Sequence, residues 1–150
     1  MRSAPGIAAF ALGLVLLLPG LSEGACSITT TGVNFGAYDV FSSTPVDSTG
    51  SVRYQCSGGS DSFVIMLSPG SGATFNPRAM LVGSNRLNYN LYLDAARTSI
   101  WGDGATGTSI FMASNASGKP VSVPIFGRIP PGQDVAAGSY SDSIVVTIQF

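Results

Sequence analysis

Ile144-Val-Val-Thr-Ile-Gln-Phe150, the end of the sequence, has the alternating polarity of a β-strand with one apolar face. Successive side chains of a strand point to opposite faces, so Val145, Thr147 and Gln149 share one of them. Burying the apolar side chains of the other face is worth roughly 6–12 kcal/mol. That is comparable with the ~5–15 kcal/mol by which a whole domain is stable. The apolar face consists of Ile144, Val146, Ile148 and Phe150.

Earlier segments of the chain also alternate with a period of two and predict strands. No segment has the 3.6-residue apolar repeat of a substantial helix. The continuous apolar run 63–67 fits a strand buried on both faces, and Pro124 favours an edge or a bulge for the strand that contains it. Residues 68–76 and 102–108 are expected loops. The predicted strands are 28–35, 50–56, 63–67, 87–93, 121–129 and 140–150.

Short strands separated by Gly-rich turns are typical of an all-β antiparallel sandwich. An immunoglobulin-like sandwich normally has about seven strands, and the predicted set is one short. Two interpretations remain open from the residues alone. Either an earlier segment closes the sheet beside the last strand, or the sandwich is incomplete. In the second case the last strand borders a groove that a strand from another chain would fill.

The composition excludes several classes of function. The chain has 150 residues, a length typical of one domain, and it has no histidine. A Ser-His-Asp triad, a Cys-His pair and an imidazole metal ligand are therefore impossible. The net charge is −1 and only one lysine is present, which leaves no basic surface for a nucleic acid. We expect no enzyme activity, no cofactor and no nucleic-acid partner.

The N-terminus predicts export. Residues 1–3 are a short positive start and residues 7–18 are an apolar run, as in a secretory signal peptide. We expect cleavage after Gly24, which gives a signal peptide over 1–24 and a mature domain over 25–150. A membrane anchor is the alternative, but the run is shorter than the ~20 residues that span a bilayer. We expect no stable membrane insertion after the signal is removed.

Export bears on the two cysteines, Cys26 and Cys56. In an oxidising compartment they predict a disulfide, worth roughly 3–4 kcal/mol by loop closure; two free thiols are the alternative. A lipoprotein is a further alternative, because Cys26 lies near the cut. However, Glu23 stands where a lipid-modification signal has an aliphatic residue.

Other motifs have a simpler structural interpretation. Residues 102–107 match G-x-G-x-x-G, but no helical pattern follows, so a surface turn is predicted. No calcium-loop pattern is present. Residues 115–117 fit a short glycosylation signal that occurs often by chance. The aspartates predicted to shape turns or to cap backbone amides are Asp94, Asp103, Asp134 and Asp142.

Three aromatic residues, Tyr92, Trp101 and Phe111, are candidates for a receptor-binding patch. The alternative is that Trp101 and Phe111 pack in the core, as most large aromatic residues do. We favour the core.

Short motifs follow one another in a characteristic order along the mature chain. In these motifs the chain resembles the spore coat protein U domain family, which includes subunits of archaic chaperone–usher pili. They are Cys26, Val33-Asn-Phe-Gly36, Gly50-Ser-Val-Arg-Tyr-Gln-Cys56, Leu87-Asn-Tyr-Asn-Leu-Tyr-Leu-Asp94-Ala-Ala-Arg97, Trp101-Gly-Asp-Gly104, Val123-Pro-Ile-Phe-Gly127-Arg-Ile-Pro-Pro-Gly132-Gln133, Gly138-Ser-Tyr140-Ser-Asp142 and the terminal run.

The resemblance implies an incomplete immunoglobulin-like sandwich that lacks its final strand and is exported through the periplasm to a surface fimbria or a spore coat. It implies a periplasmic chaperone and an outer-membrane usher, which exchanges the chaperone strand for the donor strand of a neighbouring subunit. It also implies that Cys26 and Cys56 form the family disulfide. The residues expected at the groove for the chaperone or donor strand are Ile144, Val146, Ile148 and Phe150.

The predicted mature chain departs from this pattern at its start. Polymerising subunits of this type carry a donor extension before the first cysteine, about one long strand in length. The predicted cleavage leaves only Ala25 before Cys26. We therefore expect a subunit that accepts a donor strand without supplying one, at the end of a fibre or in a non-fibrous coat. The alternative is a tip adhesin that binds a host or abiotic surface through loops 70–83 or 101–117.

Overall fold

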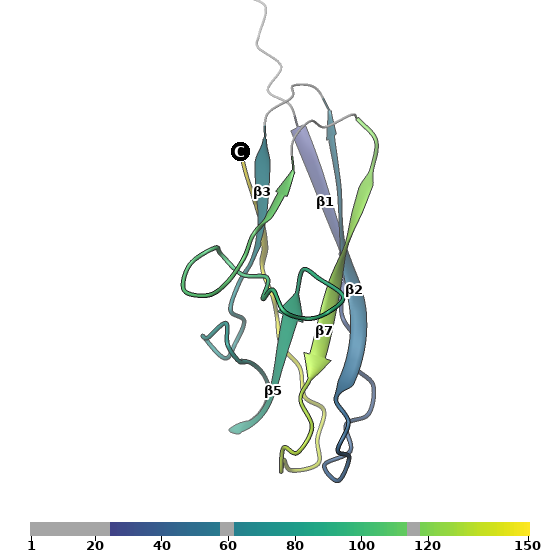
Figure 1. The fold of residues 1–150 in the computed structure, drawn as a ribbon, viewed down its shortest axis with the longest axis vertical. Coiled ribbons are helices and arrows are strands. Elements are labelled where there is room, and N and C mark those ends of the chain that lie inside the picture. Colours follow the sequence, from purple (N-terminus) through teal and green to yellow (C-terminus); the bar gives the residue numbers. More distant parts are fainter. Residues whose placement is uncertain (1–24, 58–61, 114–117) are drawn as a thin grey trace, which may run out of the picture.

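The computed structural model describes residues 25–57, 62–113 and 118–150, which form eight strands and no helix (Figure 1). The predicted signal peptide and the glycosylation motif at 115–117 lie outside these residues. The strands are β1 (Ala25–Thr31), β2 (Val46–Ser57), β3 (Phe63–Leu67), β4 (Arg78–Val82), β5 (Asn85–Tyr92), β6 (Phe111–Ala113), β7 (Val121–Ile129) and β8 (Val146–Gln149).

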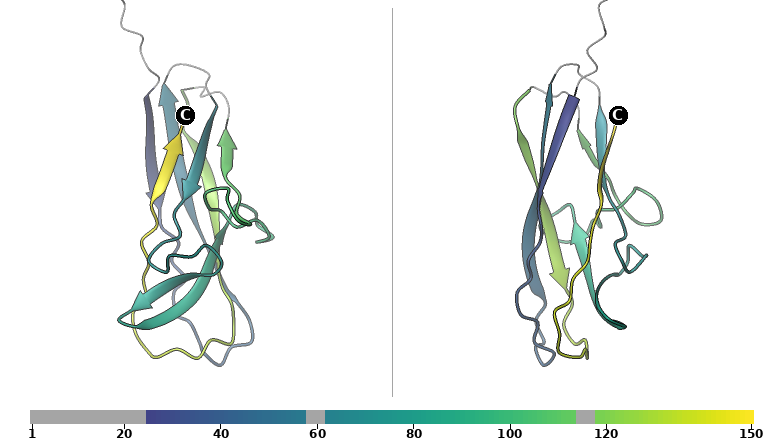
Figure 2. Two further views of the ribbon diagram at one scale, coloured as in Figure 1. Left: turned by 90° about the vertical axis from the view of Figure 1, so that its left-hand side faces the viewer. Right: turned by 180° about the vertical axis from the view of Figure 1, so that it is seen from behind.

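The strands form two sheets that face each other (Figure 2). The larger sheet has the order β1-β2-β7-β5-β4, and the smaller has the order β6-β3-β8. Within each sheet, every ladder between these strands is antiparallel. The predicted all-β antiparallel sandwich is confirmed.

The core lies between the inner faces of the two sheets. Alternate side chains of β2, β3, β5 and β7 are buried there, as the period of two predicted. In β3 only Phe63, Ile65 and Leu67 are buried, while Val64 and Met66 are half-buried. The expectation that this strand is buried on both faces is therefore wrong, because its second face lies on the outside of the sandwich.

Two strands were not predicted. β4 lies inside the expected loop 70–83, and its first residue, Arg78, is fully buried. Its guanidinium donates to the carbonyl oxygens of Ser68 and Trp101 and to Asn90 Oδ1, so the buried cation keeps its hydrogen bonds. A buried arginine in a strand contradicts the expected polarity pattern. β6 is only three residues long, too short for alternation to be detected.

Pro124 lies in β7, which is an inner strand of the larger sheet. Its ladder with β2 includes the pair Ser51 and Pro124. The ladder with β5 covers only residues 126–128 of β7. At the proline, β7 therefore has a partner on one side only. The predicted edge is correct locally, although the strand as a whole is internal, and a residue without an N–H group is tolerated at such a place.

One side of the sandwich is closed by the chain around Trp101, whose side chain is 0% exposed. The Trp101 amide donates to Leu91 O of β5 at 2.9 Å, and its indole N–H donates to Ile65 O of β3 at 2.9 Å. Leu67 N of β3 also donates to Gly102 O. These bonds connect the two sheets, and they confirm the core position predicted for Trp101.

Candidate functional site

The opposite side of the sandwich is open. A groove of about 960 Å³ lies there and reaches the hydrophobic core. Residues 30–40, which are the end of β1 and the segment after it, form one wall, and residues 135–142 with Ile144 and Val146 form the other. The floor consists of core residues of β5 and β7, namely Leu87, Tyr89, Leu91, Ile125 and Ile129.

β8 has a partner on one edge only. Its residues pair with β3 from Val146 opposite Leu67 to Gln149 opposite Val64. Among residues 25–57, 62–113 and 118–150, no strand pairs with its other edge. The left view of Figure 2 shows β8, in yellow, between β3 and β1. The backbone N–H and C=O groups of a free edge are ready to pair with another strand.

The apolar face predicted for the terminal run is present but only partly covered. Ile144, Val146 and Ile148 are half-buried, and Phe150 is 66% exposed. The opposite face is exposed as expected, with Val145 at 64%. Because none of the four apolar side chains is fully buried, the gain expected from burying them is not fully reached.

The groove contains two of the four predicted residues. Ile144 and Val146 line it. Ile148 and Phe150 continue the same face beyond it, and the Phe150 ring lies 5.9 Å from that of Phe63. The observed strand is also shorter than the predicted strand 140–150. β8 begins at Val146, and the residues before it have only isolated contacts.

The wall of the groove formed by residues 30–40 was not predicted from the sequence. Val33 and Phe35 lie beyond the end of β1 and pack on the inner face of the larger sheet. They fit because Gly127 of β7 has no side chain: a Cβ there would come within 2.7 Å of both. The Phe35 ring makes an edge contact with Tyr89 at 5.9 Å. The alternation of Val33 and Phe35 was visible in the sequence, but the notch at Gly127 was not.

A pair of polar side chains connects the floor of the groove to one of its walls. The Tyr89 hydroxyl donates to Asp142 Oδ2 at 2.6 Å, and both residues line the groove. Burial, with a further contribution from the Asp142 carboxylate, raises the pKa of Tyr89. The phenol therefore stays a neutral hydrogen-bond donor.

The Cys26–Cys56 disulfide joins β1 to β2. The two cysteines are opposite each other in the β1–β2 ladder. The bond fixes the edge strand that leads into the first wall of the groove, and neither thiol is free.

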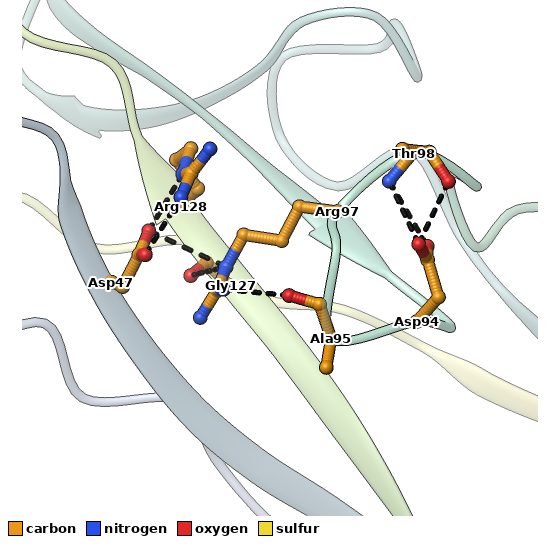
Figure 3. A network of polar contacts seen from close by, with 7 residues as sticks. All are labelled: Asp47, Asp94, Ala95, Arg97, Thr98, Gly127 and Arg128. Carbon is orange, nitrogen blue, oxygen red and sulfur yellow. Dashed lines mark hydrogen bonds and ion pairs between the residues drawn. The ribbon is translucent and has the colours of Figure 1, made fainter.

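A charged network lies on the face of the larger sheet opposite to its buried side chains, and Figure 3 shows its members. Asp47 of β2 accepts two bonds from the Arg128 guanidinium and lies 3.3 Å from Arg97 Nε. The hydrogen bond from Arg128 lowers the pKa of Asp47. Arg97 also donates to Gly127 O and Ala95 O. The network connects the loop after β5 to β2 and β7.

Three of the four aspartates expected to shape turns or cap amides accept hydrogen bonds from backbone amides, as predicted. Asp94 accepts from the amides of Thr98 and Ser99, and Asp103 accepts from the Ala105 amide. Asp142 accepts from the amide of Ser143. Asp134 has no such bond among the described residues. The motif at 102–107 is a turn, as predicted.

The part of the chain that the structure describes contains no cluster of three or more side chains able to hold a metal ion. It also contains no helix long and apolar enough to cross a membrane. The proposed aromatic patch is not formed, because Trp101 is buried and Phe111 packs against it and against Tyr54.

Comparison with known proteins adds the family. The model of the Spore Coat Protein U domain matches residues 16–147. This chain belongs to that family. Protein U of Myxococcus xanthus is 35% identical over 144 residues, which cover 85% of this chain and 78% of that protein. The suspected membership of the Spore Coat Protein U domain family is confirmed.

A solved structure has the same fold as this Spore Coat Protein U domain. It is a chain of the CsuC–CsuE chaperone–tip adhesion subunit pre-assembly complex, from the archaic chaperone–usher Csu pili of Acinetobacter baumannii. The TM-score is 0.60 at 24% identity, over 85% of this chain and 40% of that chain. This chain therefore spans about two fifths of that neighbour's length. The immunoglobulin-like antiparallel sandwich predicted from the sequence is confirmed.

Proposed function

We propose that this protein is a structural subunit of a surface fimbria or coat, and that a strand from another chain completes its sandwich. The groove beside the free edge of β8 is the observation that supports this most directly. A strand placed there would pair with the β8 backbone and cover the half-buried Ile144 and Val146. This is strand addition, in which main-chain bonds give affinity and alternate side chains fill pockets.

The pathway belongs to the same proposal. Residues 1–24 act as a signal peptide, and the domain 25–150 is exported to the periplasm, where the Cys26–Cys56 disulfide forms. A periplasmic chaperone supplies the first completing strand. An outer-membrane usher then exchanges it for the strand of a neighbouring subunit at the cell surface. The solved neighbour comes from a chaperone–subunit complex, which supports a partner of this kind.

A structural role also accounts for the residues better than catalysis does. Two polar side chains at the groove, Tyr89 and Asp142, are hydrogen-bonded to each other. The groove floor is apolar, which suits the side chains of an incoming strand.

A pull-down with the cognate chaperone tests the proposal. Val146→Asp puts a charge on the face that lines the groove and should abolish co-purification from the periplasm. Thr147→Asp is the matched control, because Thr147 lies on the exposed face of the same strand. Thr147→Asp should leave co-purification unchanged. Equal recovery of the chaperone with both variants would contradict the proposal.

The position in a fibre depends on how many residues precede Cys26 in the exported protein. N-terminal sequencing measures this directly. A start at Ala25 supports the proposed terminal or coat role. A full strand's worth of residues, roughly ten or more, contradicts it and makes the protein a donor as well.

A further inference from the structure

The chain just before β8 is held by the carboxylate of Asp142. Its Oδ1 accepts from the amides of Ser71 at 2.7 Å and Ser143 at 2.8 Å. Its Oδ2 accepts from the Tyr89 hydroxyl at 2.6 Å. One side chain thus connects the start of the terminal run to the loop after β3 and to the floor of the groove.

The other contacts of residues 141–145 are few. Ser141 forms an isolated bridge with Leu81 of β4, with N···O distances of 2.8 and 3.3 Å. Val145 exchanges hydrogen bonds with Ser68, at 2.9 Å in each direction. These residues have no continuous ladder, yet Ser141, Asp142 and Ile144 line the groove. Their position therefore rests on separate contacts, among which only Asp142 supplies a charge.

The loop after β3 comes very close to the Asp142 side chain at Gly70. A Cβ on Gly70 would collide with the Asp142 carboxylate, and Gly70 has a φ of +75°, which favours glycine. The backbone can therefore bring the Ser71 amide onto Oδ1. A hydrogen bond to a charged group is stronger than one between neutral groups.

We propose that Asp142 is a positioning residue for strand capture, an inference that rests on the proposed function. It holds residues 141–146 extended before any partner arrives, so that the groove wall and the free edge are already in place. For a partner that binds only the ordered form, the apparent affinity is the intrinsic affinity multiplied by the fraction of molecules in that form. Loss of the Asp142 contacts lowers this fraction and therefore weakens capture.

Hydrogen exchange on the exported chain tests this inference. Asp142→Asn removes the charge, and Tyr89→Phe removes only the hydroxyl that Oδ2 accepts from. Asp94→Asn is the matched control, since Asp94 holds a turn elsewhere through similar bonds. Each variant is also made with a ten-residue strand of alternating valine and threonine, fused after Phe150 through a glycine–serine linker.

In the unfused chain, Asp142→Asn should lower the protection of residues 141–146 by about tenfold or more. Tyr89→Phe should do so to a lesser extent. Protection of β2 and β7 should stay unchanged, and Asp94→Asn should leave 141–146 unaffected. In the fused chain, the protection of the added strand should fall by a similar factor in Asp142→Asn, because docking depends on the ordered wall.

Three results would count against the inference or its basis. Full protection of residues 141–146 in both Asp142→Asn and Tyr89→Phe overturns the inference, because the segment would then be ordered without the Asp142 contacts. An equal loss in 141–146, β2 and β7 also overturns it, because the role would then be general stability. A fused strand that adds no protection to β8 in the wild-type chain overturns the proposed function itself, and this is measured without any variant.

Discussion

At the scale of single residues, one wall of the groove depends on the absence of a side chain at Gly127. Gly127 leaves a notch on the inner face of β7 that Val33 and Phe35 occupy. Val33 and Phe35 belong to a wall of the groove. The position of this wall therefore depends on a glycine of β7. The Asp47 network lies on the other face of the same sheet and reaches the backbone of Gly127 through Arg97, which donates to Gly127 O.

Gly127→Ala should destabilise the protein by about 1–3 kcal/mol, because the new methyl group overpacks the contact with Val33 and Phe35. Urea unfolding measures the change. Gly32→Ala is the control: a Cβ there meets nothing within 4 Å, so its stability should stay within about 0.5 kcal/mol of the wild type or rise slightly. Equal stability of the two variants would show that the notch is not needed.

Asp47→Asn should lower stability at pH 7 by up to about 1 kcal/mol, the size of a partly exposed ion pair. Since the folded-state pKa of Asp47 is lowered, its contribution is present above the ordinary carboxyl pKa and is lost as the pH falls through the folded value. The difference from the wild type should therefore shrink as the pH falls below the ordinary carboxyl pKa of about 3.9. Urea titrations between pH 2 and 7 measure this.

Asp134→Asn is the control for Asp47→Asn, since it changes the net charge equally and Asp134 is exposed. It should show no comparable loss at neutral pH. A difference between Asp47→Asn and the wild type that persists undiminished at low pH would contradict the ion-pair explanation.

At the scale of elements, alternation of polarity was enough to predict the strands with one buried face, such as β2, β5 and β7. It failed for β4, because its buried Arg78 is satisfied by carbonyl groups from distant loops. No local pattern carries that information. The terminal strand was predicted correctly in its faces but not in its burial, which depends on what lies beside it.

The edge strand β1 depends on its disulfide. Replacing Cys26 and Cys56 by serine should lower the free energy of unfolding by roughly 3–4 kcal/mol, through the greater entropy of the unfolded chain. Urea unfolding of the oxidised wild type and of the double variant measures this. The same loss should follow reduction of the wild-type protein, and reduction should leave the double variant unchanged. A loss on reduction of the double variant would contradict this explanation.

At the scale of the whole molecule, the two sides of the sandwich differ. Hydrogen bonds around Trp101 connect the sheets on one side, while the other side contains the groove and the free edge of β8. The family resemblance predicted this incompleteness, whereas the residues alone left it undecided. Counting the predicted strands could not decide whether the sandwich is complete. Two strands were not predicted, and whether one side of the sandwich is open depends on how the strands are arranged.

The thermal stability of the exported chain with a completing strand shows whether the sandwich lacks a strand of its own. The strand of alternating valine and threonine, fused after Phe150, is compared with a tail of equal length made of glycine and serine. We predict that the strand raises the melting temperature by at least about 5 °C relative to the tail, because it binds only the folded state. Identical melting temperatures for the two fusions would contradict the account.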